Sequence, residues 1–207
     1  MGSSPSSSPS ASVSVTPSAS LSQELGDEQV VTVAEAKAQL NITHSDDDEL
    51  IDAYIDAATS WAQSYQGRKY LNETCIDYLD DWPADVIRPR WSNLVSVTSI
   101  TYIDTAGVQQ TWSSAQYDVD ADAVPGRICP GYGYSWPTFR GDQAGIVVTY
   151  VAGYGATKDS APAHVRQALL LLVGHWYANR EAVSDLNLTQ IPFGVRALLG
   201  MDRVIRV

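Results

Sequence analysis

Apolar residues recur at helical spacing near both ends of the folded part of the chain. The first such part holds a short amphipathic segment at 33–40 and a longer one that begins after Ser45. In the longer segment, apolar residues return every three or four positions, at Leu50, Ile51, Tyr54, Ile55, Ala58, Trp61, Ala62 and Tyr65. This spacing predicts two helices, the longer one with a single apolar stripe.

Polar residues mark the ends of these two helices. Thr32 and Glu35 form a T-x-x-E capping box at the start of the first, and Asn41 can end it. Ser45 is predicted to cap the second, and the four acidic residues behind it suit the positive end of the helix dipole. Gly67 is predicted to end that helix.

A second helical part follows Gly155. Pro162 fits the first turn of a helix whose segment 165–177 is apolar almost all round. A helix without a polar face must be covered on all sides, and a second subunit could supply part of that cover. Pro192 is predicted to start a last short helix. The apolar residues of the two helices are Val165, Leu169, Leu170, Leu171, Leu172, Val173, Trp176, Tyr177, Val195, Leu198 and Leu199.

Between the helical parts, apolar residues recur at every second position, and this alternation predicts strands. Segment 74–79 has this pattern, and so does 95–102, but the parity of the second shifts near Thr98 or Ser99. A shift of one residue predicts a β-bulge. The stretch 104–107 is typical of a hairpin turn.

Two further segments complete the predicted β module. Residues 146–151 are apolar on both parities, which predicts a strand in the middle of the sheet. Residues 125–145 hold five glycines, three prolines and several aromatic residues, which predicts a long aromatic loop.

The order of these elements predicts an α+β fold. Residues 30–72 and 155–207 form a helical domain of about four helices, and 73–154 form an antiparallel β module inserted into it. Residues 1–29 are predicted to be an extended arm. Eleven serines and three prolines lie among residues 1–22, which carry no charge. Such a segment cannot fold alone, so we expect it to lie on a neighbouring subunit.

Charge narrows the possible partners. The 207 residues include 24 acidic and 13 basic ones, for a formal charge of −11. A chain this acidic is a poor candidate for binding DNA or anionic lipid by general electrostatics. Neither a membrane-spanning segment nor a secretory signal is expected. The chain is predicted to be cytosolic, or part of something assembled in a cytosol.

Candidate metal ligands are few. The first part of a calcium-binding loop signature, D-x-D-x-D, occurs at Asp118, Asp120 and Asp122. The signature then requires glycine and glutamate, where this chain has Ala123 and Cys129. A solvated acidic turn is the better interpretation. His164 and His175 are three helical turns apart, about 16 Å, which is too far to share one zinc ion. No metal or other cofactor is therefore predicted.

Catalytic motifs are also missing. The chain has no G-x-S-x-G elbow, phosphate-binding loop or dinucleotide fingerprint. Cys75 and Cys129 both fall in the β module and are predicted to be free thiols of a reducing compartment. A carboxylate pair for glycoside hydrolysis stays a minor alternative among so many acids. No catalytic residue is predicted.

Several spaced motifs resemble one family. The chain is similar to the head–tail connector proteins of tailed bacteriophages, also called adaptors or head-completion proteins, in a branch with a β insertion. The resemblance covers about residues 30–207. Its motifs lie, in order, at 50–68, 97–107, 147–155, 162–181 and 191–199.

The resemblance implies a structural ring, typically of twelve subunits, under the portal at one capsid vertex of the virion, assembled in the host cytoplasm. The ring extends the DNA channel and is a platform for a tail or stopper protein. Genomic DNA passes through it without specific binding. The resemblance implies neither a catalytic role nor membrane binding.

Three sets of residues are candidates for these contacts. The apolar helix is predicted to form the subunit interface, and the C-terminal segment is predicted to dock on the portal because connectors of this type commonly use it so. Acidic residues early in the second helix are candidates for facing the channel, because an acidic wall does not hold DNA. The three sets are Leu169, Leu172, Val173, Trp176 and Tyr177; Arg196, Leu198, Leu199, Arg203, Val204, Ile205, Arg206 and Val207; and Asp47, Asp48 and Asp52.

Two other functions remain open from the residues. A β-rich tail protein that binds carbohydrate or a receptor would use Trp112, Tyr132, Tyr134 and Trp136 as stacking surfaces. A cell-wall hydrolase is the remaining alternative.

Overall fold

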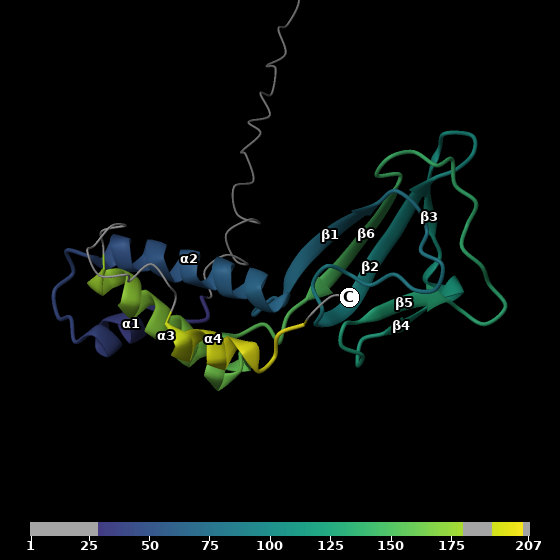
Figure 1. Ribbon diagram of the computed structural model, residues 1–207. Helices are drawn as coiled ribbons and strands as arrows, with labels where there is room; N and C mark the ends of the chain where they lie inside the picture. Colours follow the sequence, from purple (N-terminus) through teal and green to yellow (C-terminus); the bar gives the residue numbers. More distant parts are fainter. Residues whose placement is uncertain (1–28, 180–191, 205–207) are drawn as a thin grey trace, which may run out of the picture.

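The computed structural model describes residues 29–179 and 192–204, and these form two lobes, one helical and one of β-strands (Figure 1). The chain enters the β lobe directly from α2 and returns from it through β6 to α3. Both connections therefore lie at the same end of the β lobe. The helices are α1 (Val33–Leu40), α2 (Asp48–Gln66), α3 (Ala163–Ala178) and α4 (Phe193–Gly200).

The β lobe contains a four-stranded antiparallel sheet and a separate two-stranded sheet. The larger has the order β1-β6-β2-β3, and the smaller pairs β4 with β5. The predicted α+β class is thus confirmed. The strands are β1 (Glu73–Leu79), β2 (Leu94–Ile103), β3 (Gln109–Trp112), β4 (Tyr117–Asp120), β5 (Arg127–Pro130) and β6 (Ile146–Ala152).

The first helix follows the predicted capping chemistry. The Thr32 side chain accepts from the Glu35 backbone N–H, and the Glu35 carboxylate accepts from the Thr32 N–H at 2.9 Å. Asn41 ends α1 in the left-handed region at φ 60°, and Gly67 ends α2 at φ 69°. These predicted ends are confirmed.

The predicted cap of α2 is wrong by two residues. Asp47, not Ser45, is the N-cap residue, and its side chain makes no capping hydrogen bond. The carboxylate of Asp47 instead accepts a hydrogen bond from the Tyr177 hydroxyl on α3. A contact with another helix thus competes with the local cap, and a run of good capping residues does not fix which of them is used.

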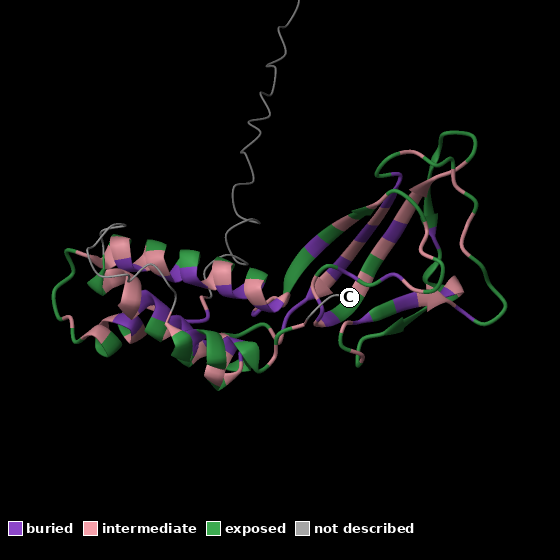
Figure 2. Ribbon diagram, viewed as in Figure 1, coloured by how far each residue is buried: buried purple, intermediate pink, exposed green. Residues whose placement is uncertain are grey.

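The apolar stripes of α2 and α3 meet in the core of the helical lobe (Figure 2). Ile51, Ile55 and Ala58 of α2 are buried there. Val195 and Leu199 of α4 complete this core from a third side. No helix among the described residues is long and apolar enough to cross a membrane.

The larger sheet has the predicted irregularities. The register of β2 against β6 shifts between Val97 and Ser99, which confirms the predicted bulge, and shifts again between Leu94 and Ser96. Asp104 begins the predicted hairpin turn, where Gly107 has φ 81°. Strand β6 lies between β1 and β2, as its apolar pattern predicts.

An aromatic cluster fills the space between the two sheets. Trp82 stacks on Trp136 with ring centroids 5.0 Å apart and meets Trp112 edge-on at 5.7 Å. Trp112 is 4% exposed, so two of the four proposed carbohydrate-stacking residues are used in packing. The exposed Tyr132 and Tyr134 remain. The tail-protein alternative thereby keeps only two of its four proposed stacking residues.

The predicted loop at 125–145 is partly wrong. Strand β5 lies within it, and Ile128 of this strand is fully buried. Gly126 stands against Leu94, where a Cβ atom would lie 2.5 Å from the leucine Cβ. The glycines here permit close packing rather than an open loop.

Candidate interaction surfaces

Helix α3 is covered mainly by its own chain. Leu169, Leu172 and Val173 are at most 1% exposed in the core of the helical lobe, and Trp176 and Tyr177 are half-buried at its edge. Trp176 meets Tyr54 of α2 edge-on at 6.3 Å. A second subunit therefore has only the outer face of α3 to contact, and that face is uncharged, with Ala163, Gln167, Leu171 and Ala178 exposed.

The C-terminal segment is held on the end of α2. Buried Gln66 donates to the Leu199 carbonyl at 2.8 Å, and its own carbonyl accepts from the Val204 N–H at 3.1 Å. Arg68 donates to the Asp202 carbonyl at 2.9 Å. Of the predicted portal-contacting residues, Leu199 is buried in the core of the helical lobe. Arg196 and Arg203 are exposed, and Leu198 and Val204 are intermediate. Ile205, Arg206 and Val207 lie outside the described residues.

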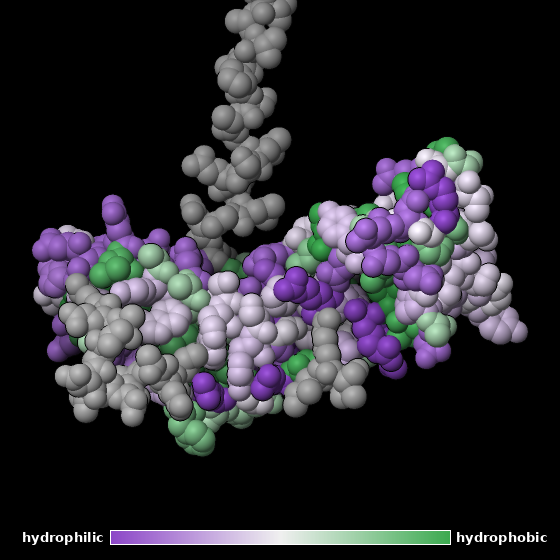
Figure 3. Space-filling view, turned by 45° about the horizontal axis from the view of Figure 1, so that its top comes forward, coloured by the Kyte–Doolittle hydropathy of each residue, from purple (hydrophilic) through white to green (hydrophobic). Residues whose placement is uncertain are grey.

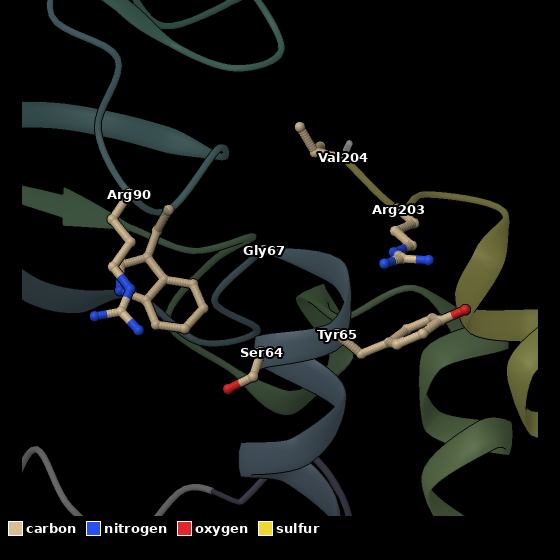
Figure 4. Close-up of a pocket in the computed structure, with 7 residues that line it drawn as sticks. Ser64, Tyr65, Gly67, Arg90, Arg203 and Val204 are labelled. Carbon is tan, nitrogen blue, oxygen red and sulfur yellow. The ribbon is translucent and has the colours of Figure 1, made fainter. Parts of the chain in front are cut away.

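Near this segment lies a groove of about 400 Å³ between the two lobes (Figure 4). Arg203 lies over the Tyr65 ring at 4.5 Å on one side, and Arg90 lies over the Trp91 ring at 5.6 Å on the other. Lys69 also approaches Trp91, at 4.7 Å. The guanidinium groups of Arg90 and Arg203 thus line one groove of an acidic chain, whereas Lys69 is paired with Glu73 at 2.6 Å. The sequence patterns missed this groove because its walls come from segments far apart in the chain.

Each of the three channel candidates has a partner within the chain. Asp47 accepts from Tyr177, Asp48 pairs with Lys37 at 2.6 Å, and Asp52 accepts from Gln29 at 2.8 Å. Asp46 and Glu49 beside them are exposed. Hydrophilic residues gather at this free end of the helical lobe (Figure 3). The end is therefore acidic, and two of its carboxylates point toward solvent.

Glu35 connects α1 to the start of α3. Its carboxylate lies 2.8 Å from the Arg166 guanidinium and 3.3 Å from Lys158. The backbone hydrogen bond from Thr32 lowers the pKa of Glu35 below its ordinary value of 4.5, and Lys158 acts in the same direction. The charged form of Glu35 is therefore the form that stabilises the fold.

This shift predicts a pH-dependent effect of Glu35→Gln. Because the folded-state pKa is lowered, the stabilisation is present above the unfolded value and is lost as pH falls through the folded one. Thermal melting should show Glu35→Gln less stable at pH 7 by up to about 1 kcal/mol, since the pair is partly exposed. The difference should shrink below pH 4.5. Exposed Glu49→Gln is the control, and a Glu35→Gln effect independent of pH would contradict the prediction.

The described residues contain no group of three or more possible metal ligands. His164 Nε2 instead lies 3.0 Å from the carboxylate of Asp202 in the C-terminal segment. Asp120 pairs with Arg127 across β4 and β5 at 2.7 Å. Cys75 is buried, and burial raises its pKa. Within the described part of the chain these residues have structural contacts, and none belongs to a group of three possible ligands.

Comparison with known proteins gives a family match over part of the chain and a fold over most of it. Residues 30–117, less than half of the chain, match the model of the phage gp6-like head–tail connector proteins. The predicted resemblance to head–tail connectors is thus confirmed over this part of the chain. No curated protein matches the chain at a significant level.

Solved structures extend the connector fold to most of the chain. The neck of an empty GTA particle, computed with C6 symmetry, has a chain that is 23% identical with a TM-score of 0.69, covering 86% of this chain and 91% of that one. A chain of the native GTA neck with C12 symmetry is 24% identical with a TM-score of 0.67, covering 84% and 89%. The virion of the native gene transfer agent contains a match at 23% identity and TM-score 0.68, with 86% and 91% coverage. The chain therefore shares its two-lobed fold with chains of a particle neck. The family whose model matches residues 30–117 suggests a structural rather than enzymatic role.

Proposed function

We propose that the chain is a structural connector that forms a ring in the neck of a phage-like virion, under the portal. The ring would extend the DNA channel and provide the platform for a tail or stopper protein, after assembly in the host cytoplasm. One observation carries this proposal: a chain from a particle neck shares the fold over 86% of this chain. The C6 and C12 symmetries used for that neck support a ring, and we propose twelve subunits.

The domain division that we propose follows the two lobes. The helical domain, 30–72 with 155–207, would build the wall of the ring, and the β module at 73–154 would extend from it. The outer face of α3 supports this arrangement, because it is uncharged where two copies of an acidic chain must meet. Ring closure needs a heterologous contact, so this face would meet a different surface of the next copy.

The C-terminal segment is the proposed portal contact. Val204 is fixed on Gln66, so residues 205–207 leave the described chain beside the cationic groove. The exposed Arg196 and Arg203 add the guanidinium groups that are common in protein interfaces. The fixed start of this short tail would direct it toward one partner.

Deletion of residues 205–207 is expected to leave a folded protein that no longer binds portal rings. The contacts of Gln66 and Arg68 with the chain up to Val204 stay intact, so the melting temperature should hold. Co-sedimentation with portal rings should fall at least tenfold. The control is a deletion of the same length, residues 2–4, at the other terminus. Unchanged binding of the C-terminal deletion would exclude this tail as the portal contact.

A symmetry-resolved image of the virion neck tests the function as a whole. The expected density is a ring with the described fold, directly under the portal. Particles made without the chain should package DNA but carry no tail. Tailed particles that lack the chain would overturn the proposal.

A further inference from the structure

One face of the four-stranded sheet carries no charged residue, and among the described residues no helix covers it. The register places the side chains of Ile146, Val148 and Tyr150 on the buried face, so the alternate positions lie on the other. No described helix packs along that second face. Its residues are Thr74, Ile76, Tyr78, Ser96, Ser99, Thr101, Ile103, Gln109, Thr111, Val147, Thr149 and Val151.

Strand β1 is the free edge next to this face. It has β6 as its single neighbour in the sheet, and no other described segment forms a ladder with it. Ile76 is 52% exposed and Tyr78 is 63% exposed on it, and Figure 2 shows exposed residues along the strand. A seven-residue edge with exposed apolar side chains is a template for a further strand.

The N-terminal arm has the pattern of such a strand. From Ser10 to Thr16 a hydroxyl residue alternates with Ala11, Val13 and Val15. Strict alternation over seven residues is typical of a strand with one apolar face, and β-branched residues favour it. The segment is uncharged, like the sheet face, so neither side has to lose the hydration of a charge.

The anchor of the arm allows it to leave its own lobe. Gln29 is hydrogen-bonded to Asp52 at 2.8 Å and Asp56 at 3.1 Å, on the first half of α2. The fourteen residue-to-residue steps from Val15 to Gln29 can span about 46 Å when extended. The remaining part of α2 toward the β lobe is about 21 Å long. An extended arm therefore reaches beyond the end of α2 with about 25 Å to spare.

We propose that residues 10–16 add as a strand to the free edge of β1 in the next copy of the ring. The backbone of the arm would pair with β1, and its apolar side chains would continue the row formed by Ile76 and Tyr78. This strap rests on the proposed ring. It adds a second heterologous contact to the one at α3, between the arm of one copy and the β module of the next.

Cysteine pairs in assembled particles test the strap. Ala11→Cys, Val13→Cys and Val15→Cys are each combined with Ile76→Cys, because Cα atoms of directly opposed residues on neighbouring antiparallel strands lie about 4.5–5.5 Å apart, within the Cα range of disulfides. Oxidation should link one chain to the next and give a ladder of oligomers on a denaturing gel. The matched control combines the same three arm variants with Thr111→Cys, because Thr111 is exposed on β3 at the opposite edge of the same face. The β1 pairs should link at least tenfold more.

Three outcomes would overturn the strap: equal linking at both edges, links within single chains, or no links in particles that contain the chain. Variants with only one of the two introduced cysteines show how much linking comes from the natural thiols Cys75 and Cys129. If the necks lack the chain, the proposed function fails, and the same pairs in the concentrated purified protein then decide the strap alone. Val13→Pro should abolish the ladder because proline removes a ladder N–H, whereas Ser6→Pro should not. A ladder that persists in Val13→Pro also contradicts the proposal.

Discussion

Replacing Leu172 with aspartate is expected to unfold the chain, whereas the same change at Leu171 should leave it folded but unable to enter the ring. Leu172 is fully buried between α3 and the other helices, and Leu171 is 37% exposed on the outer face of α3. Adjacent residues of one helix thus separate the core of the subunit from its proposed contact with the next.

The size of the Leu172→Asp effect follows from its burial. Truncating a buried leucine costs about 2–5 kcal/mol, and an unpaired carboxylate in the same place adds its own desolvation. A domain is stable by only about 5–15 kcal/mol, so most or all of that stability is removed. Thermal melting followed by circular dichroism should show no cooperative transition, or one lowered by more than 10 °C.

The Leu171→Asp variant separates interface from fold. Exposed substitutions usually change stability by no more than about 0.5 kcal/mol, so its melting curve should match the native one. Its charge would have to be buried if α3 contacts a neighbour, and incorporation into particles should fall at least tenfold. Leu171→Ala is the control and should assemble. Normal incorporation of Leu171→Asp would remove this face from the subunit interface, and a normally folded Leu172→Asp would contradict the core assignment.

Local patterns predicted most elements of this fold because their chemistry lies within a few residues. The capping box of Thr32 and Glu35 sets the start of α1 through contacts three residues apart. The parity change before Ile100 is a direct consequence of a bulge, since each extra residue turns the side chains to the other face.

The predictions that failed depend on partners distant in sequence. Nothing near Asp47 indicates that Tyr177, 130 residues away, takes its carboxylate. The glycines around β5 suggest a loop unless Leu94 is known to pack against Gly126. The all-apolar α3 was correctly expected to need cover on every side, but its own chain supplies more of that cover than the sequence could show.

Reversing the charge at the acidic end of α2 is expected to slow genome ejection and make it salt-dependent. We propose that this end faces the channel, where Asp47, Asp48 and Asp52 were predicted to lie. These three have contacts within the chain, so their replacement would also disturb the helical lobe. The exposed Asp46 and Glu49 allow a cleaner test, with both changed to lysine.

The expected direction follows from the polyanion that passes through the channel. Carboxylates repel DNA over about a Debye length, ~8 Å at physiological salt, which keeps the duplex away from the wall. Lysines instead bind phosphates and release counterions. The logarithm of the binding constant then falls with the logarithm of the salt concentration, with a slope of about −0.9 for each phosphate neutralised. A ring repeats each lysine in every subunit, so a modest change per copy becomes a band of cations around the duplex.

Ejection from Asp46→Lys, Glu49→Lys particles should be roughly tenfold slower at low salt and approach the native rate as salt rises. The neutral pair Asp46→Asn, Glu49→Gln separates loss of repulsion from gain of attraction, and should give a smaller effect with little salt dependence. Asp85→Lys reverses an exposed acid on the β module and controls for total charge. Native ejection rates at every salt concentration would place these carboxylates on the outside of the ring. Their presence would then reflect only the helix dipole, which favours acids at this end without any channel.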